Sequence, residues 1–207
     1  MLWLLLALPF MHAFSPDRQV LDTLETGGVS SAPGIALPRS IVAGTLPGGV
    51  DIDLPGKEQI QWITLSQAQA KQAQAPRPIL IDLYTDWCGW CKVMDKKTYS
   101  QSDVARYINE HYYPVKLDAE GKESLTWRGR SFGYNASARI HNFAIFLTNG
   151  QLSFPQTIFI MPGDQQPQAI PGYLEVKDME LLLKYFGEGH YGRIAFPDYQ
   201  KKFSPSW

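Results

Sequence analysis

A chain of 207 residues is long enough for one domain of ordinary size with extra segments. Hydrophobic residues make up 44% of the sequence and aromatic residues 13%, so the chain holds enough apolar material for one core. The formal net charge is -1 and no long basic run occurs, so composition argues against nucleic acid or an anionic membrane surface as the partner.

The chain begins with an apolar run from Leu2 to Phe10. This run is too short to cross a bilayer, which needs about 20 apolar residues, and it resembles the apolar region of a secretory signal peptide, with Ala13 as a small residue before cleavage. We therefore expect residues 1–13 to be a signal peptide, and the mature chain to be exported and to have no transmembrane segment. No Lys or Arg precedes the run, so a buried N-terminal helix and a start site placed slightly too late remain alternatives.

Residues 14–57 are rich in proline and glycine and show no long helical or strand period. We expect an extension that is either a tether or an extended wrap over a domain that begins near residue 58. Gln59–Ile63 predicts a strand. Ser66 is then a candidate N-cap for a helix over Gln67–Ala75, whose alanines and glutamines are typical of a solvated helix.

The most informative stretch runs from Ile79 to Lys92. It opens with a short apolar run around Asp82, which predicts a buried strand. The two cysteines of the chain, Cys88 and Cys91, follow with C-x-x-C spacing at the start of an amphipathic helix. Unpaired backbone N–H groups and the helix dipole favour an anion there, and such sites lower the pKa of a cysteine from about 8.5 to roughly 3.5–7.5.

A C-x-x-C pair can serve redox exchange, metal binding or a structural disulfide. A bridge between residues so close in sequence removes little chain entropy from the unfolded state, so a purely stabilising role is a weak explanation. His12, His111, His141 and His190 are scattered, and no complete set of metal ligands is visible, although Cu(I) or, with outside ligands, zinc stays an alternative. We therefore expect a redox centre and no metal site.

The strand, the cysteine pair and the helix together resemble the active-site segment of the thioredoxin superfamily. Asp82 matches the buried acid of that family, Trp87 the tryptophan before the first cysteine, and Lys92 the lysine after the second. The resemblance covers residues 58–187 and implies an α/β thioredoxin fold, a central mixed β-sheet flanked by helices, with an insertion before a cis-proline, an N-terminal extension and a tail over residues 188–207. Within the superfamily, the chain resembles thioredoxin-like proteins of bacterial cell envelopes with a Trp-Cys-x-x-Cys-Lys motif, which implies a periplasmic location.

The pattern after the redox helix agrees with this resemblance. Apolar residues recur at helical spacing after Ser102, a candidate N-cap, and Tyr113–Asp118 predicts the next strand. In that strand, Lys116 stands where the family places a lysine close to its buried acid, although a surface lysine explains the sequence equally well. Residues 119–154 exceed the matching segment of a thioredoxin and hold a hairpin-like stretch and a short apolar helix over Asn142–Leu147. We expect this insertion to lie near the active-site face and to bias partner choice, or to act only as a lid over the core.

The segment Phe154-Pro155-Gln156 stands where the superfamily has its cis-proline. The resemblance implies that Pro155 is cis and lies beside the cysteines, and that the backbone of Phe154 pairs with an extended partner chain. Gln156 takes the place of the threonine that usually follows the proline. The chain then predicts an edge strand over Gln168–Ile170 and a final helix over Val176–Phe186.

The residues and the resemblance together predict a thiol–disulfide oxidoreductase. Cys88, expected to be the more exposed cysteine, attacks a partner disulfide, and Cys91 then releases the partner. Asp82, with a pKa raised by burial, moves the proton of Cys91. The resemblance adds Lys116 and Pro155 to the catalytic residues.

Substrate contacts are expected from Trp87, Gly89, Trp90 and Phe154. The inner pair Gly89-Trp90 differs from the Gly-Pro of thioredoxin and the Gly-His of disulfide isomerases, so the direction of electron flow stays open. The expected partners are protein thiols or disulfides and a redox partner protein, the expected oligomeric state is a monomer, and no cofactor is expected beyond the Cys88–Cys91 disulfide. A partner-docking module whose tryptophan-rich surface matters more than its thiols is the remaining alternative.

Overall fold

The computed structural model describes residues 58–164 and 166–207. The predicted signal peptide, residues 1–13, and the predicted proline- and glycine-rich extension, residues 14–57, lie outside this part of the chain. Among the described residues, no helix combines the length and the apolar character that crossing a membrane requires.

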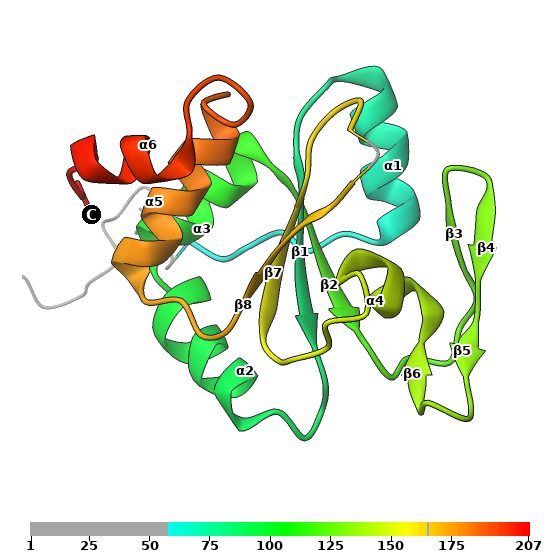
Figure 1. Cartoon of the computed structure of the whole chain (residues 1–207). Coiled ribbons are helices and arrows are strands. Elements are labelled where there is room, and N and C mark those ends of the chain that lie inside the picture. The colour runs from blue at the N-terminus through cyan, green and yellow to red at the C-terminus, as the bar shows by residue number, and fades with distance from the viewer. Residues whose placement is uncertain (1–57, 165) are drawn as a thin grey trace, which may run out of the picture. The chain divides into compact units, whose positions relative to one another are not determined.

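A four-stranded sheet forms the centre of the fold, with the strand order β2-β1-β7-β8 (Figure 1). Its strands are β1 (Ile79–Tyr84), β2 (Tyr113–Asp118), β7 (Gln156–Ile160) and β8 (Gln168–Pro171). β2 runs parallel to β1, whereas β7 pairs antiparallel with β1 and β8 antiparallel with β7. The predicted central mixed sheet is therefore confirmed, and so is the edge strand that begins at Gln168.

Helices cover both faces of the sheet, which explains why β1 is buried without interruption from Ile79 to Leu83 (Figure 1). Ile79 and Ile81 belong to a core cluster that includes residues of α1 and α4, whereas Leu80 belongs to a second cluster with residues of α3 and α5. Asp82 lies two residues after Leu80 and therefore projects from the same face as Leu80. These helices are α1 (Leu65–Gln74), α3 (Ser102–His111), α4 (Asn142–Leu147) and α5 (Val176–Gly187).

The cysteine pair lies directly after β1, as predicted. Cys88 is the N-cap of α2 (Gly89–Met94), and this helix continues into η1 (Asp95–Tyr99), a π-helical turn. Met94 is buried as expected, while Val93 is only half-buried. The cysteines thus stand at the junction of a buried strand and a helix, where the sequence pattern placed them.

The predicted strand over Gln59–Ile63 is wrong. Within this segment only Ile63 forms a bridge, parallel to Val115 of β2. The backbone N–H of Gln61 instead donates to the side chain of Asn109 in α3, at 2.8 Å. The side chain of Asn109 and one bridge to β2 therefore hold this segment on the domain. A β-strand pattern in the sequence does not predict this kind of attachment.

Two predicted N-caps are displaced. Thr64, and not Ser66, caps α1, because its side chain accepts a hydrogen bond from the Gln67 backbone while the Gln67 side chain accepts one from the Thr64 backbone. Ser102 is the first residue of α3, and Gln101 precedes it as N-cap without a side-chain hydrogen bond.

The insertion folds as two short hairpins followed by α4, so the predicted hairpin-like stretch and apolar helix are confirmed. Trp127 and Phe132 each pack against the ring of Phe143, with centroids 5.9 and 5.1 Å away, and all three belong to the core cluster beneath α1 and α4. The insertion is thus part of the domain core. Its strands are β3 (Leu125–Trp127), β4 (Arg130–Phe132), β5 (Tyr134–Asn135) and β6 (Ile140–His141).

Most of α1 is exposed, as the prediction of a solvated helix expected, but two of its glutamines also hold the insertion and the end of β7. The side-chain amide of Gln69 donates to the Thr126 carbonyl at 2.8 Å, and its oxygen accepts from the Arg128 N–H at 2.9 Å. Gln72 donates to the carbonyls of Arg77 and Ile160, at 2.9 and 3.3 Å. The helix therefore clamps the β3–β4 turn and the end of β7 through neutral side chains.

The tail folds back on α5 through α6 (Phe196–Lys202) (Figure 1). The ring of Tyr185 lies 5.2 Å from the rings of both Phe196 and Tyr199. Further along, the ring of Trp207 lies 5.8 Å from that of Tyr107 in α3. The aromatic residues of the tail thus dock on the domain.

Candidate active site

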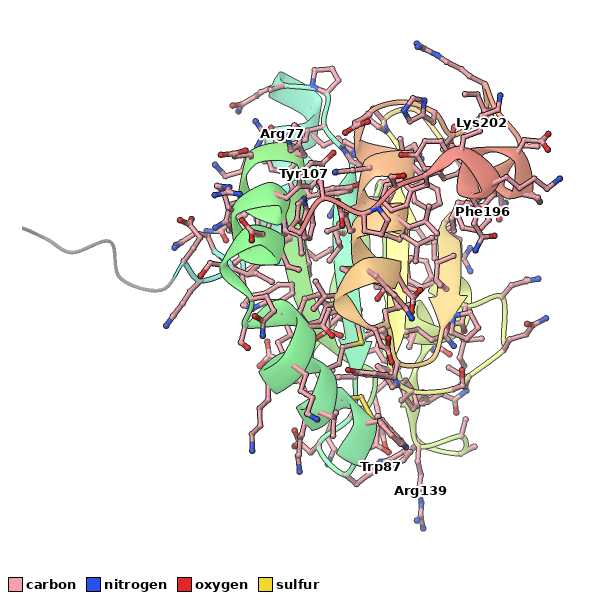
Figure 2. All side chains as sticks on the ribbon, turned by 90° about the vertical axis from the view of Figure 1, so that its left-hand side faces the viewer. Arg77, Trp87, Tyr107, Arg139, Phe196 and Lys202 are labelled. Carbon is pink, nitrogen blue, oxygen red and sulfur yellow. A yellow bond between two sulfur atoms is a disulfide. The ribbon has the colours of Figure 1, made fainter. Side chains whose placement is uncertain are left out.

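The two cysteines form a disulfide at the C-terminal end of β1, visible in yellow in Figure 2. The Cα atoms are 5.3 Å apart, and the backbone N–H of Cys91 donates to the Cys88 sulfur at 3.1 Å. Cys88 is 4% exposed and Cys91 5%, so the expected greater exposure of Cys88 is wrong. The disulfide and the Cys91 N–H together hold the Cys88 sulfur against the first turn of α2.

Asp82 is buried in the strand that leads to the cysteines, and burial raises its pKa to about 6 although the ammonium of Lys116 lowers it. Lys116 Nζ lies 2.9 Å from the Asp82 carboxylate, because β1 and β2 pair these residues directly. The structure therefore places Lys116 beside the acid and not at a strand-end surface. The same ammonium lies 5.4 Å from the ring of Trp62 and 5.2 Å from that of Tyr84.

A second carboxylate at this position was not foreseen. Asp95, the first residue of η1, also contacts the ammonium of Lys116, and its negative charge raises the pKa of Asp82. Asp95 follows Cys91 by four residues, and residues four apart lie on one helix face. That spacing is the signal that could have identified Asp95 from the sequence.

The peptide bond between Phe154 and Pro155 is cis, as the resemblance implied. Gln156, the unusual residue after the proline, is buried, and its side chain donates to the Gln151 carbonyl at 2.7 Å. Thr157 is the residue that β7 places opposite Asp82 in β1. Gln156 thus holds the loop before β7 in place. Thr157 is the residue of β7 that lies next to Asp82.

Two tryptophans lie within two residues of Cys88 in the sequence, and each pairs with an aromatic ring from a distant segment. Trp87 and Trp90 are 66% and 61% exposed, and they pair with the rings of Phe154 at 5.9 Å and Tyr173 at 5.5 Å. Gly89 is exposed as the first residue of α2, with open space around the place of a Cβ. The predicted contact residues are thus brought together, and Tyr173, which no sequence pattern singled out, joins them.

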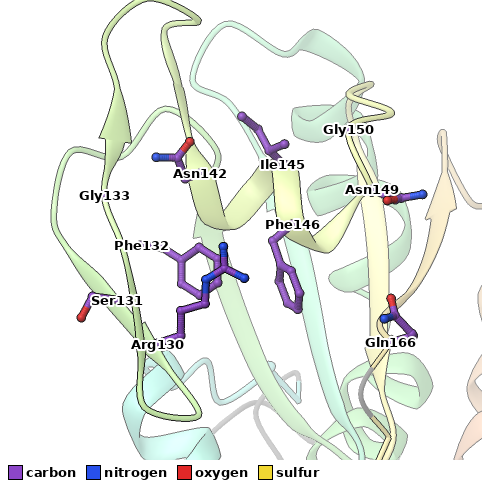
Figure 3. Close-up of a pocket in the computed structure, with 10 residues that line it drawn as sticks. All are labelled: Arg130, Ser131, Phe132, Gly133, Asn142, Ile145, Phe146, Asn149, Gly150 and Gln166. Carbon is purple, nitrogen blue, oxygen red and sulfur yellow. The ribbon is translucent and has the colours of Figure 1, made fainter.

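The insertion reaches the same end of the molecule as the disulfide. Figure 2 places Arg139, in the turn between β5 and β6, at the end where Trp87 lies. A cavity of about 620 Å³ lies elsewhere in the insertion, between β4 and α4, where the guanidinium of Arg130 lies over the ring of Phe132 (Figure 3). That cavity includes none of the predicted site residues.

Histidine has a structural role in the insertion. His141 Nδ1 accepts from the Phe143 N–H at 3.0 Å and so caps α4, while Nε2 lies 2.9 Å from the Glu123 carbonyl. Across residues 58–164 and 166–207, no group of three or more His, Cys, Asp and Glu side chains is placed to hold a metal ion.

Several known proteins are similar to parts of the chain. Thiol:disulfide interchange protein DsbD from Yersinia enterocolitica is 47% identical over 49 residues, which are 23% of this chain and 8% of that protein. An uncharacterized protein from Caenorhabditis elegans is 20% identical over 104 residues, which are 50% of this chain and 13% of that protein. The chain therefore spans only a small part of the length of these relatives.

Among solved structures, a DsbH oxidoreductase is 18% identical with a TM-score of 0.46, covering 63% of this chain and 86% of that one. A thioredoxin-fold protein from Helicobacter pylori is 16% identical with a TM-score of 0.46, covering 61% of this chain and 81% of that one. A family model, Thioredox_DsbH, "Protein of unknown function, DUF255", matches residues 55–185. Because this match spans more than half of the chain and includes the Trp-Cys-Gly-Trp-Cys motif, the protein belongs to the thioredoxin-like DsbH family, DUF255.

Proposed function

We propose that the protein is a thiol–disulfide oxidoreductase that exchanges disulfides with protein partners through Cys88 and Cys91. The observation that carries this proposal is the hydrogen bond from the Cys91 N–H to the Cys88 sulfur, 3.1 Å, at the start of α2. A donor in that place stabilises a thiolate on Cys88 once the disulfide is reduced. The exposed rings of Trp87 and Trp90 offer a partner an apolar surface beside it.

Exchange proceeds in two displacement steps. The Cys88 thiolate attacks one sulfur of a partner disulfide, a bond forms between the two sulfurs, and the other partner sulfur leaves as a thiolate that takes a proton from solvent. The Cys91 thiolate then attacks the Cys88 sulfur, which releases the partner as its second thiol and forms the Cys88–Cys91 disulfide. Two electrons pass to the partner, and the reverse sequence oxidises a partner dithiol.

Asp82 is the proposed acceptor of the Cys91 proton. A carboxyl with a pKa of about 6 exchanges protons readily near neutral pH, which suits a general base. Burial is the main cause of that raised pKa, and Lys116, the direct partner of the acid, lowers it in part. Pro155 and Phe154 are proposed to present backbone to an extended segment of the partner during the attack.

We infer a redox domain over residues 58–187 that acts as a monomer, with residues 188–207 as its packed tail. The apolar run Leu2–Phe10 supports export to the periplasm. The similarity to a thiol:disulfide interchange protein supports a protein dithiol as the partner that sets the redox state of the pair.

Replacement of each cysteine tests the mechanism. Cys88→Ser should abolish exchange with a disulfide substrate, whereas Cys91→Ser should accumulate a mixed disulfide at Cys88, detectable by intact mass. Full activity in Cys88→Ser contradicts the mechanism, and retention of the biological function by the double variant favours a docking module. The reduction potential of the pair gives the direction: about -270 mV marks a reductant of thioredoxin type and about -120 mV a disulfide-forming oxidant.

A further inference from the structure

The cavity of about 620 Å³ in the insertion runs along the edge of a strand. It contacts four consecutive residues, Arg130 to Gly133, and successive side chains of a strand point to opposite faces, so a cavity that touches them all follows the strand edge. On its other side lie Asn142, Ile145 and Phe146, which share one face of α4 (Figure 3). We refer to this cavity, with a strand edge on one side and a helix on the other, as the β4–α4 groove.

The outer edge of β4 offers a free backbone donor and acceptor at Ser131. Arg128 and Gly129 have φ values of 48° and 78°, as the two central residues of a type I′ turn do. The residues that flank such a turn, Trp127 and Arg130, form a hydrogen-bonded pair. Because hydrogen-bonded and non-hydrogen-bonded pairs alternate along an antiparallel ladder, the N–H and C=O of Ser131 point away from β3. No other backbone group of residues 58–164 and 166–207 pairs with them.

The opposite edge of the same hairpin is already covered. Thr126, which lies across from Ser131, likewise turns its backbone outward, and its carbonyl accepts from the side-chain amide of Gln69 at 2.8 Å. One edge of the hairpin is therefore held by α1, whereas the other lines the β4–α4 groove. An unpaired strand edge is a template for a further strand, and extended peptides bind to proteins by adding to such an edge.

The side chains of the groove place one positive charge next to an apolar surface. Arg130 and Phe132 project from the same face of β4, and the guanidinium lies 4.8 Å from the centre of the Phe132 ring. That ring packs on Phe146 of α4, with centroids 5.4 Å apart. Of the described residues that line the groove, only Arg130 is charged near neutral pH, and none of the ion pairs within this part of the chain includes it.

We propose that the β4–α4 groove binds an extended peptide segment of a partner protein, which adds to β4 as an antiparallel strand and carries the sequence apolar-x-acidic. The acidic side chain lies opposite Arg130 and the apolar one opposite Phe132, both on the same face of the added strand. The residue between them lies opposite Ser131 and exchanges two backbone hydrogen bonds with it. The groove contains no residue of the disulfide site, so this interaction surface goes beyond the proposed exchange function.

The test measures the binding of three fluorescent pentapeptides with blocked ends to the full chain by anisotropy. The Glu peptide, Thr-Ile-Thr-Glu-Thr, has the apolar-x-acidic order, the Gln peptide replaces its acid, and the Pro peptide replaces the central Thr with a residue that has no N–H to donate. We expect the Gln peptide to bind about fivefold more weakly than the Glu peptide, which is the upper range for a solvent-exposed ion pair. The Pro peptide should bind about tenfold more weakly, because it leaves the Ser131 carbonyl without a donor.

Variants of the protein remove each half of the interaction. Arg130→Gln should weaken the Glu peptide about fivefold and abolish the difference between the Glu and Gln peptides. Ser131→Pro removes an N–H that the β3–β4 ladder does not use, and it should weaken the Glu peptide about tenfold. Arg139→Gln is the matched control, because Arg139 is an exposed arginine of the same insertion that does not line the groove, and its affinity for the Glu peptide should equal that of the wild type.

Hydrogen exchange identifies what covers the strand edge. The Ser131 N–H should exchange rapidly in the protein alone and slowly when the Glu peptide is bound. Slow exchange in the protein alone overturns the proposal, because another segment of this chain or a second copy then occupies the edge.

The binding measurements can overturn the proposal in two further ways. Absence of binding of the Glu peptide at about 1 mM does so directly. Equal affinities for the Glu and Pro peptides do so as well, because the groove then holds a carboxylate and not a strand. Neither result touches the exchange function, which is measured separately with glutathione disulfide.

Discussion

The ammonium nitrogen of Lys116 lies 2.9 Å from the carboxylate of Asp82, and the same ammonium contacts Asp95. Burial raises the pKa of Asp82 from its usual 3.8 to about 6, and Lys116 offsets only part of that increase. At neutral pH the acid is therefore ionised in surroundings that favour its neutral form. Both the stability of the fold and the chemistry of the cysteines should depend on this one group.

Asp82→Asn should stabilise the protein at pH 8 and change little at pH 4. A carboxyl with a higher pKa in the folded than in the unfolded chain favours the folded state when protonated, so its stabilising effect is lost as pH rises from 3.8 through about 6. The increase in pKa from 3.8 to about 6 means that the ionised acid lowers the free energy of unfolding by about 3 kcal/mol at pH 8. Urea unfolding of the disulfide form of both proteins at the two pH values measures it.

Asp198→Asn is the control for this effect, because Asp198 is an exposed acid in α6. We expect a change within about 0.5 kcal/mol at both pH values for such a surface substitution. Destabilisation of Asp82→Asn at pH 8 would contradict the raised pKa, because it would mean that the ionised acid stabilises the fold.

Asp95→Asn should move the ionisation of Asp82 to lower pH. The negative charge of Asp95 raises the pKa of Asp82, and without it Lys116 pairs with a single carboxylate. The release of a Cys88 mixed disulfide by Cys91 needs ionised Asp82 as proton acceptor, so its rate should rise with pH through about 6 in the wild-type protein. Stopped-flow measurement from pH 5 to pH 8 should give a lower midpoint in the variant.

The same measurement on Asp82→Asn should show no inflection near that pH. An inflection that stays in Asp82→Asn assigns the ionisation to another group and contradicts the proposed role of the acid. Tyr84 and Tyr99 also lie in the field of Asp82, but the pKa of each phenol is raised above its usual 10, chiefly by burial, so neither titrates in this range.

Local signals in the sequence were sufficient for the main elements of the fold. The apolar run at Ile79–Tyr84 has no polar face, which indicates a strand covered on both sides, and the structure covers it on both sides. The family resemblance supplied what no local pattern contains, namely that Lys116 meets Asp82 and that Pro155 is cis. The meeting of Lys116 and Asp82 is a relationship between segments, fixed by the register of β1 and β2.

The remaining features could not be predicted because their partners are distant in the chain. Gln69 stands in a helix whose polar sequence indicates exposure to solvent. Its hydrogen-bond partners, however, lie in a hairpin 57 and 59 residues further along the chain. Tyr173 follows a turn without any periodic signal, and only the folded chain brings it to Trp90. Gln59–Ile63 has strand-forming residues, but the side chain of Asn109 takes one of its backbone donors.

Gln69→Ala should loosen the β3–β4 turn while leaving the sheet intact. The substitution removes both hydrogen bonds that the side chain makes to Thr126 and Arg128, and each such bond contributes about 1 kcal/mol. Hydrogen exchange should therefore become faster at Arg128 and unchanged in β1. Gln74→Ala, an exposed glutamine of the same helix, is the matched control, and equal exchange rates in the two variants would argue against the clamp.

Glu180 is a carboxylate of α5 with no exposed surface, and it binds the end of the tail. Its oxygens accept from Lys184 Nζ at 2.6 Å and from the N–H of Ser206 at 2.8 Å, with the N–H of Trp207 at 3.4 Å. Burial alone would raise the pKa of Glu180, but these hydrogen bonds outweigh it and leave the pKa below its usual 4.5. The ionised acid thus stabilises the folded state and joins the tail to α5.

Glu180→Ala should destabilise the protein at pH 7 by about 3 kcal/mol, since it leaves Lys184 without its buried partner, and should expose the tail to proteolysis after Lys202. The contribution of a carboxyl with a lowered pKa is present above 4.5 and is lost as pH falls through the folded value, so the difference from wild type should shrink below pH 4.5. Glu175→Ala removes an exposed acid paired with Lys177 and should change stability by less than about 1 kcal/mol. If the two variants unfold alike and the tail stays resistant to protease in both, the packing of aromatic rings on Tyr185, and not the buried acid, holds the tail in place.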